Sequence, residues 1–209
     1  MKQNIIFLIN SILSGIMIGI GGTIFLSLEN RIIGSFMFAI GLFVIVSNGF
    51  NLFTGKVGYV FDNNYKYLIE VFITLVGNFI GTYIVGFVLK YTRISEVVMK
   101  NAQIICEIKI EDNIFSILIL SIFCGLLMYI AVNGYKTIKS DLGKNLIIFL
   151  AVSTFILCGF EHCIANMFYF TISEMWSLKT VGYLIIMILG NSIGGVLIPL
   201  CNKLIKKIC

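Results

Sequence analysis

One short stretch of this sequence combines residue types that could do chemistry inside a largely hydrophobic chain. Glu161 and His162 are adjacent, His162 is the only histidine in 209 residues, and apolar runs lie on both sides of the pair. An ionisable pair is costly in the hydrocarbon of a bilayer, so it is expected to face a protein-lined cavity. A histidine can also change its charge near neutral pH. The pair is therefore the first candidate site.

Two cysteines beside the pair offer a second kind of chemistry. Cys158 and Cys163, together with His162, could bind a metal ion or take part in redox chemistry in the membrane. Zinc sites use fuller ligand sets, and no fourth ligand is evident in the sequence. No nucleophile motif such as G-x-S-x-G and no phosphate-binding glycine loop is present either. We therefore predict no enzyme, no metal and no cofactor, and keep a membrane redox or metal-handling protein as the alternative.

The composition indicates an integral membrane protein. Hydrophobic residues make up 59% of the chain and charged residues 12%, whereas a soluble domain is about half apolar and about a quarter charged. The net charge of +5 comes from residues in short loops and at the termini, with no basic face for nucleic acid. We expect one transmembrane domain over residues 1–209.

Six apolar segments are long enough to cross a bilayer, which takes about 20 residues. They are residues 5–28, 32–61, 67–89, 114–133, 145–170 and 180–200. The second contains polar and glycine residues in its middle, and the fifth contains the Glu161–His162 pair, so both helices are predicted to break. Irregular backbone at that depth must be buried in protein or line a cavity. Residues 90–113 are expected to form a polar loop outside, and the lysine distribution places both termini in the cytoplasm.

The two halves of the chain resemble each other. Ser14-Gly15 is matched with Cys124-Gly125, Thr54 with His162, and Gly77-Asn78 with Gly190-Asn191. The repeated unit has three spans and covers about residues 5–89 and 114–205. Because the number of spans is odd, the two copies insert in opposite orientations, which predicts an aquaporin-like, all-α inverted repeat. Paired broken helices indicate a substrate site at the membrane midplane. Their unpaired backbone N–H groups can replace part of an anion's hydration shell.

Four motifs in their order along the chain resemble the formate/nitrite transporter family, with its hydrosulfide-channel branch as one option. They are Phe50-Asn51-Leu52-Phe53-Thr54-Gly55, Gly77-Asn78 with Gly81, Gly159-Phe160-Glu161-His162 with Ala165-Asn166-Met167, and Gly190-Asn191 with Gly194-Gly195. The resemblance implies a homopentamer in the cytoplasmic membrane. Each protomer would have one pore for a small monovalent anion: formate, nitrite or hydrosulfide.

The resemblance also implies roles for individual residues. Thr54 and His162 meet at the pore centre, and Lys109 lies near the outer mouth. Apolar constrictions correspond to Phe38, Leu42, Leu52 and Phe155, and supporting positions correspond to Phe53, Glu161, Asn166 and Asn191. His162 either donates a hydrogen bond or hands a proton to the anion, and the second role would grow as the pH falls through ~6.5. Glu161 is expected to cap free N–H groups or bind a polar partner.

The chain departs from the family pattern in three places. Few residues precede the first apolar run, so an N-terminal gating helix is not expected. Gly125 stands where formate-type members usually carry asparagine, and the connection over residues 171–179 is short. These departures leave the choice among formate, nitrite and hydrosulfide open.

Overall fold

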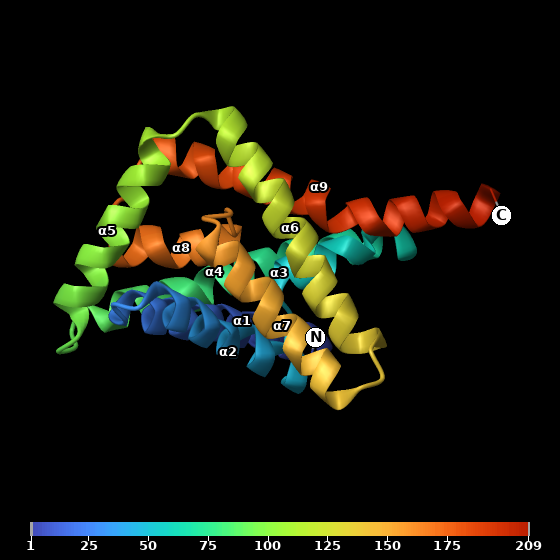
Figure 1. Cartoon of the computed structure of the whole chain (residues 1–209), viewed down its shortest axis with the longest axis horizontal. Coiled ribbons are helices and arrows are strands. Elements are labelled where there is room, and N and C mark those ends of the chain that lie inside the picture. Colours follow the sequence, from blue (N-terminus) through green and yellow to red (C-terminus); the bar gives the residue numbers. More distant parts are fainter. Residues whose placement is uncertain (1, 209) are drawn as a thin grey trace.

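The computed structural model describes residues 2–208 as a helical membrane protein, and Met1 and Cys209 lie outside the described residues (Figure 1). The helices are α1 (Lys2–Ser27), α2 (Arg31–Asn48), α3 (Phe53–Lys56), the short 3-10 helix η1 (Val57–Asp62), α4 (Lys66–Leu89), α5 (Ser95–Glu111), α6 (Ile114–Thr137), α7 (Asp141–Leu157), α8 (Cys163–Ile172) and α9 (Leu178–Ile208). The predicted all-α class is confirmed.

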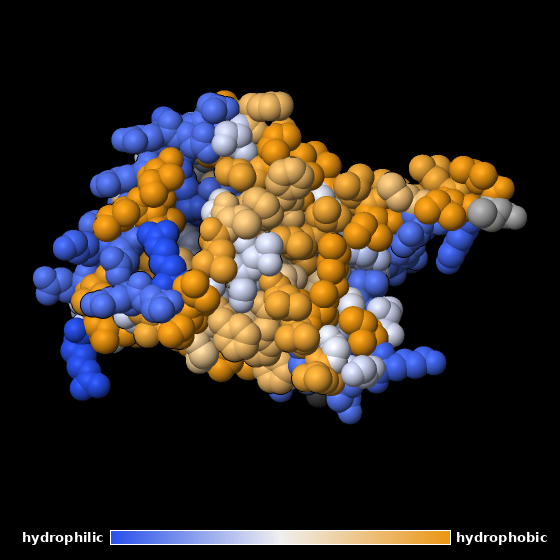
Figure 2. Space-filling model, in the orientation of Figure 1, coloured by the Kyte–Doolittle hydropathy of each residue, from blue (hydrophilic) through white to orange (hydrophobic). Residues whose placement is uncertain are grey.

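Five of these helices, α1, α2, α4, α6 and α9, are long and apolar enough to cross a bilayer. The fifth predicted segment, residues 145–170, is divided between α7 and α8, and neither half has the length of a span by itself. Hydrophobic atoms form a broad band across the middle of the visible face, and hydrophilic residues gather at the left end near α5 (Figure 2). This distribution is that of a chain inserted in lipid.

The connection expected as a loop over residues 90–113 contains a regular helix instead. The 17-residue helix α5 buries Val98, Ala102, Cys106 and Lys109 on one face. These positions recur at helical spacing, so the segment is amphipathic. That face packs on α8 and α1, at the end of the molecule opposite the C-terminal end of α9 (Figure 1). The loop prediction was wrong because it rested on the polar composition of the segment and not on the helical spacing of the residues that it buries.

Equivalent helix contacts relate the two halves. Helix α1 packs on α4 and α6 packs on α9. In the first pair a side chain at Gly15 would collide with the backbone of Asn78, and in the second a side chain at Gly125 would collide with the backbone of Asn191. The small residues therefore allow the same close approach twice, as is typical of packed membrane helices.

Both predicted helix breaks are present and share one backbone conformation. Gly49 and Gly159 adopt left-handed φ angles of 68° and 67°, which glycine reaches without steric cost. The following residues, Phe50 and Phe160, donate their N–H groups back into the helices that have just ended, which is the Schellman pattern. This alignment makes Leu52 the counterpart of His162. The match of Thr54 with His162 was therefore out of register by two residues.

Candidate functional site

The side chain of Asn78 holds the first break in place. Its Oδ1 accepts the Phe53 N–H at 2.8 Å, and its Nδ2 donates to the carbonyl oxygens of Ser11 and Asn51 at 2.7 and 2.9 Å. Asn78 is fully buried, so its bonds to Phe53 and Asn51 pair backbone groups that would otherwise be unsatisfied, and its bond to Ser11 ties the break to α1. Phe53 thus contributes its backbone N–H as well as a buried ring.

The side chain of Asn191 does the same for the second break. Its Oδ1 accepts the Cys163 N–H at 2.9 Å, and its Nδ2 donates to the carbonyl oxygens of Ser121 and Glu161 at 2.8 and 2.7 Å. Asn191 is also fully buried. Two asparagines from α4 and α9 therefore fix the two breaks in equivalent positions.

Thr54 and His162 meet between the two breaks. The distance from Thr54 Oγ1 to His162 Nε2 is 2.9 Å, and both residues are 1% exposed. The other ring nitrogen, Nδ1, accepts the Ala165 N–H at 3.1 Å and so caps α8. A nitrogen that accepts a hydrogen bond is unprotonated, so the ring proton of the neutral imidazole lies on Nε2. Nε2 then donates to Thr54, whose own O–H is free to turn toward another acceptor.

Aromatic and aliphatic side chains surround this contact. The rings of Phe38 and Phe155 lie 5.9 Å apart, edge to face. The ring of Phe155 also stacks on the imidazole of His162 at 5.5 Å. Leu42 and Leu52 are buried to the same degree as the two phenylalanines. The four residues assigned to constrictions therefore lie in the buried apolar core, and Phe155 is in direct contact with His162.

A buried ion pair lies behind His162. Lys109 Nζ is 2.6 Å from Glu161 Oε2, and the two residues are 8% and 3% exposed. The same carboxylate accepts from Asn166 Nδ2 at 2.8 Å, and Asn166 also donates to the His162 carbonyl at 3.0 Å. Glu161 has the polar partner that was expected. Lys109 was predicted to lie near the outer mouth of the pore, and the structure pairs its charge with Glu161.

Two cavities approach the centre from opposite ends of the molecule. The first, here called the Lys109 cavity, has a volume of about 160 Å³ and is lined by Arg31, Lys109, Phe155, Glu161 and His162 among others. Phe25, at the end of α1, also lines it. His162 is thus a wall of this cavity as well as the partner of Thr54.

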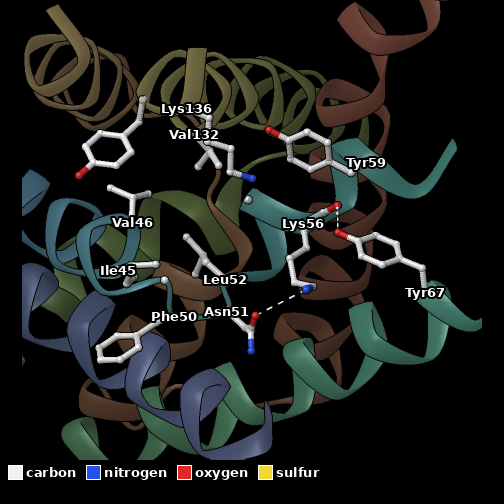
Figure 3. Close-up of a pocket in the computed structure, with 13 residues that line it drawn as sticks. Ile45, Val46, Phe50, Asn51, Leu52, Lys56, Tyr59, Tyr67, Val132 and Lys136 are labelled. Carbon is white, nitrogen blue, oxygen red and sulfur yellow. Dashed lines mark hydrogen bonds between the residues drawn. The ribbon is translucent and has the colours of Figure 1, made fainter. Parts of the chain in front are cut away.

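The second cavity, here called the Lys56 cavity, has a volume of about 390 Å³. Its walls include Asn51, Leu52, Lys56, Tyr59 and Lys136 (Figure 3). It lies at the end where the described chain begins and ends. Lys56 Nζ is 4.8 Å from the ring of Phe7 in α1, and Lys203 in the last turns of α9 pairs with Asp62 of η1 at 2.8 Å.

The sequence reasoning missed several residues of this arrangement. Asn78 was recognised as a repeat position but not as a member of the site, and its pairing with Asn191 was the available signal. Tyr169 lines the Lys109 cavity, three residues beyond Asn166 on the same helix. Lys56 and Lys136 were counted only as loop charges.

The cysteine–histidine cluster does not assemble a metal site within the residues that the structure describes. No group of three His, Cys, Asp or Glu side chains there could hold a metal ion. Both nitrogens of His162 are engaged by Thr54 and Ala165, and Cys158 is exposed whereas Cys163 is buried. This geometry gives the alternative no support.

The fold and the site together define a multi-pass membrane protein with two broken helices around a polar centre. A family model described as formate/nitrite transporter matches residues 2–204. The chain therefore belongs to the formate/nitrite transporter family. Membership identifies it, at the level of the family, as a transporter and not an enzyme.

Individual relatives agree with this assignment. A "Formate-nitrite transporter" of Plasmodium knowlesi (strain H) is 27% identical over 95% of this chain and 75% of its own length. Among solved structures, a "Pentameric formate channel with formate bound" aligns with a TM-score of 0.81 at 23% identity, over 98% of both chains. An "FNT family ion channel" aligns with a TM-score of 0.82 at 21% identity, over 94% of this chain and 88% of its own. These structures establish the fold.

Proposed function

We propose that this protein conducts a small monovalent anion, namely formate, nitrite or hydrosulfide, across the cytoplasmic membrane. The observation that carries the proposal is the Thr54–His162 contact, which stands between cavities that open toward opposite ends of the molecule. The anion would pass the apolar side chains of Phe38, Leu42, Leu52 and Phe155 and exchange hydration water for hydrogen bonds at the centre. Preorganised donors lower the large cost of moving a charge through hydrocarbon.

In this mechanism His162 acts through Thr54. The ring proton on Nε2 engages Thr54 Oγ1, and the Thr54 hydroxyl donates its own proton to the anion as a hydrogen bond. An imidazolium has two donors and no acceptor, so protonation of His162 would break its cap on the Ala165 N–H. The resting geometry therefore favours a neutral His162 that donates a hydrogen bond over one that hands its proton to the anion.

The proposed assembly is a homopentamer with one pore in each protomer and both termini in the cytoplasm. The name of the aligned formate channel supports the pentamer, and the lysines of the short connections support the orientation. The Lys56 cavity would then be the cytoplasmic mouth. The Lys109 cavity would be the outer one.

Flux measurements in liposomes test the proposal. Purified protein should carry at least one of the three anions, and Thr54→Val should reduce its rate by about tenfold to a hundredfold. The substitution keeps the side-chain shape and removes one hydrogen bond to a charged ligand, worth about 1.5–3 kcal/mol. Thr23→Val is the matched control, because the Thr23 hydroxyl bonds only within α1.

A pH series separates the two roles of His162. If His162 donates only a hydrogen bond, His162→Asn should retain part of the flux and leave its pH dependence unchanged. A pH dependence that disappears in His162→Asn would instead support proton transfer to the anion. Unsubstituted protein that carries none of the three anions at any pH would overturn the proposed function.

A further inference from the structure

The Lys56 cavity contains two ammonium groups from different parts of the chain. Lys136 reaches in from the last turn of α6, and Lys56 lies below it at the end of α3, beside Asn51 and Tyr67 (Figure 3). Lys136 Nζ lies 4.3 Å from the centre of the Tyr59 ring, and Lys56 Nζ lies 5.1 Å from that of Tyr67. Aromatic faces attract a cation without carrying a compensating charge. The two ammonium groups are thus positioned but not neutralised by these rings.

Few carboxylates balance these charges. Lys56 Nζ lies 3.4 Å from Glu70, whose side chain is 49% exposed; such a pair is weak because water screens it. Among the side chains that the structure describes, no carboxylate lies within ion-pairing distance of Lys136. The cavity therefore has a net positive charge on its walls.

The equivalent place at the other break is electrically different. Asn51 and Glu161 occupy the same position after Gly49 and Gly159, and each lies beside a lysine. Lys56 Nζ is 3.5 Å from the neutral amide oxygen of Asn51, whereas Lys109 Nζ is 2.6 Å from the Glu161 carboxylate. The Lys109 charge is thus balanced by a carboxylate at this position, whereas the amide at the equivalent position beside Lys56 carries no charge.

The dimensions of the Lys56 cavity fit a small anion that still carries water. At about 390 Å³ it is the larger of the two cavities, and a water molecule occupies ~30 Å³ in the liquid. Its two lysines can offer ammonium donors, and Leu52 and Gly55, on either side of Thr54 in the sequence, also line it. An anion held here is one step from the apolar passage.

We infer that Lys56 and Lys136 form an anion-binding site that concentrates the transported anion at this mouth alone, so that the two faces of the channel differ in affinity. The inference rests on the proposed function, because it concerns the same anion. Focused positive charge raises the local concentration of an anion before it loses its water. The charged residues that line the Lys109 mouth balance one another, because Arg31 and Lys109 are matched by Asp112 and Glu161, so that mouth lacks an equivalent site.

Sided transport kinetics test this inference, with formate, nitrite and hydrosulfide as probes. Initial rates are measured in right-side-out and inside-out membrane vesicles for Lys136→Gln, Lys56→Gln and the double variant. Lys139→Gln is the matched control: it removes an exposed lysine of the same connection that does not line the cavity. Lys136→Gln is the primary variant because Lys56 also pairs with Glu70.

From the Lys56 face, each single variant should raise KM about threefold and the double variant about tenfold, with Vmax unchanged. From the opposite face KM should change less than twofold while Vmax falls by a factor similar to the rise in KM at the Lys56 face, because Vmax/KM of a passive channel is equal in the two directions. High salt should reduce the difference in KM through screening. Equal changes in KM from both faces, or an equal change in Lys139→Gln, would overturn the inference while leaving the proposed function intact. Unsubstituted protein with no flux of any anion would overturn both.

Discussion

The two helix breaks have the same backbone and different chemistry. Each has a left-handed glycine, a phenylalanine that closes the preceding helix, and a buried asparagine from another helix that pairs three backbone groups. The third position after the glycine is Leu52 in one break and His162 in the other, and only His162 caps the next helix with its side chain. The two breaks thus have equivalent backbones but different side chains at this third position.

This difference separates the residues that hold the backbone of each break from the residues between them, whose chemistry differs in the two halves. The breaks need glycine for the left-handed backbone angle, and they need asparagine because buried backbone groups must be satisfied. The positions between these residues have no such requirement. The chain places a neutral Asn51-Leu52 pair in one break and the ionisable Glu161-His162 pair in the other, and the second recruits Lys109 from α5.

The largest expected loss of stability comes from replacing the two buried asparagines that hold the breaks. Asn78→Leu and Asn191→Leu each leave two backbone groups of a break unpaired, at about 2 kcal/mol each, and should destabilise the protein by roughly 4 kcal/mol. Thermal unfolding of the detergent-purified protein measures the loss. Asn48→Leu, at an exposed asparagine of the first break, is the control and should be nearly neutral. A large loss for only one of the two buried asparagines would refute the equivalence of the breaks.

The next effect concerns the charge that only the second break carries. Glu161→Gln leaves the Lys109 ammonium buried without a counter-charge and should cost about 3–5 kcal/mol. The double variant Glu161→Gln with Lys109→Met should recover most of this loss, because no unpaired charge remains. Asn51→Asp makes the reciprocal change at the first break and should alter stability by less than about 1 kcal/mol, since Lys56 is partly exposed. A Glu161→Gln variant as stable as the unsubstituted protein would show that the pair is not needed.

The smallest effect tests the shared backbone angle. Gly49→Ala and Gly159→Ala should each destabilise by about 1–2 kcal/mol, because an L-residue with a side chain disfavours the left-handed region. Space is not the cause, since a Cβ at either glycine would have no neighbour within 4 Å. Gly182→Ala has equally open surroundings inside α9 and should be neutral or stabilising. Clearly unequal losses of stability at Gly49 and Gly159 would show that the two breaks do not depend equally on the left-handed backbone angle.

Much of this arrangement was predictable from the sequence. Apolar runs, the polar interruptions within two of them and the spaced glycine and asparagine motifs indicated broken helices in an inverted repeat, and the structure has both. These features are local: a helix in lipid must break where its residues cannot sustain it, and the break must then be buried. The pairing of Gly77-Asn78 with Gly190-Asn191 was also correct, because both asparagines perform the same task.

Only the tertiary structure decided the register and the partners. Leu52, not Thr54, is the counterpart of His162, and Thr54 meets His162 because the two half-helices face each other across the centre. Lys109 reaches Glu161 from a helix where the sequence predicted a loop, and Lys56 and Lys136, predicted only as charges in loops, line a cavity. The sequence determined where the chain must break. Which side chains then met depended on how segments far apart in the chain packed, because a charge or a hydrogen bond acts through distance in space and not through separation along the chain.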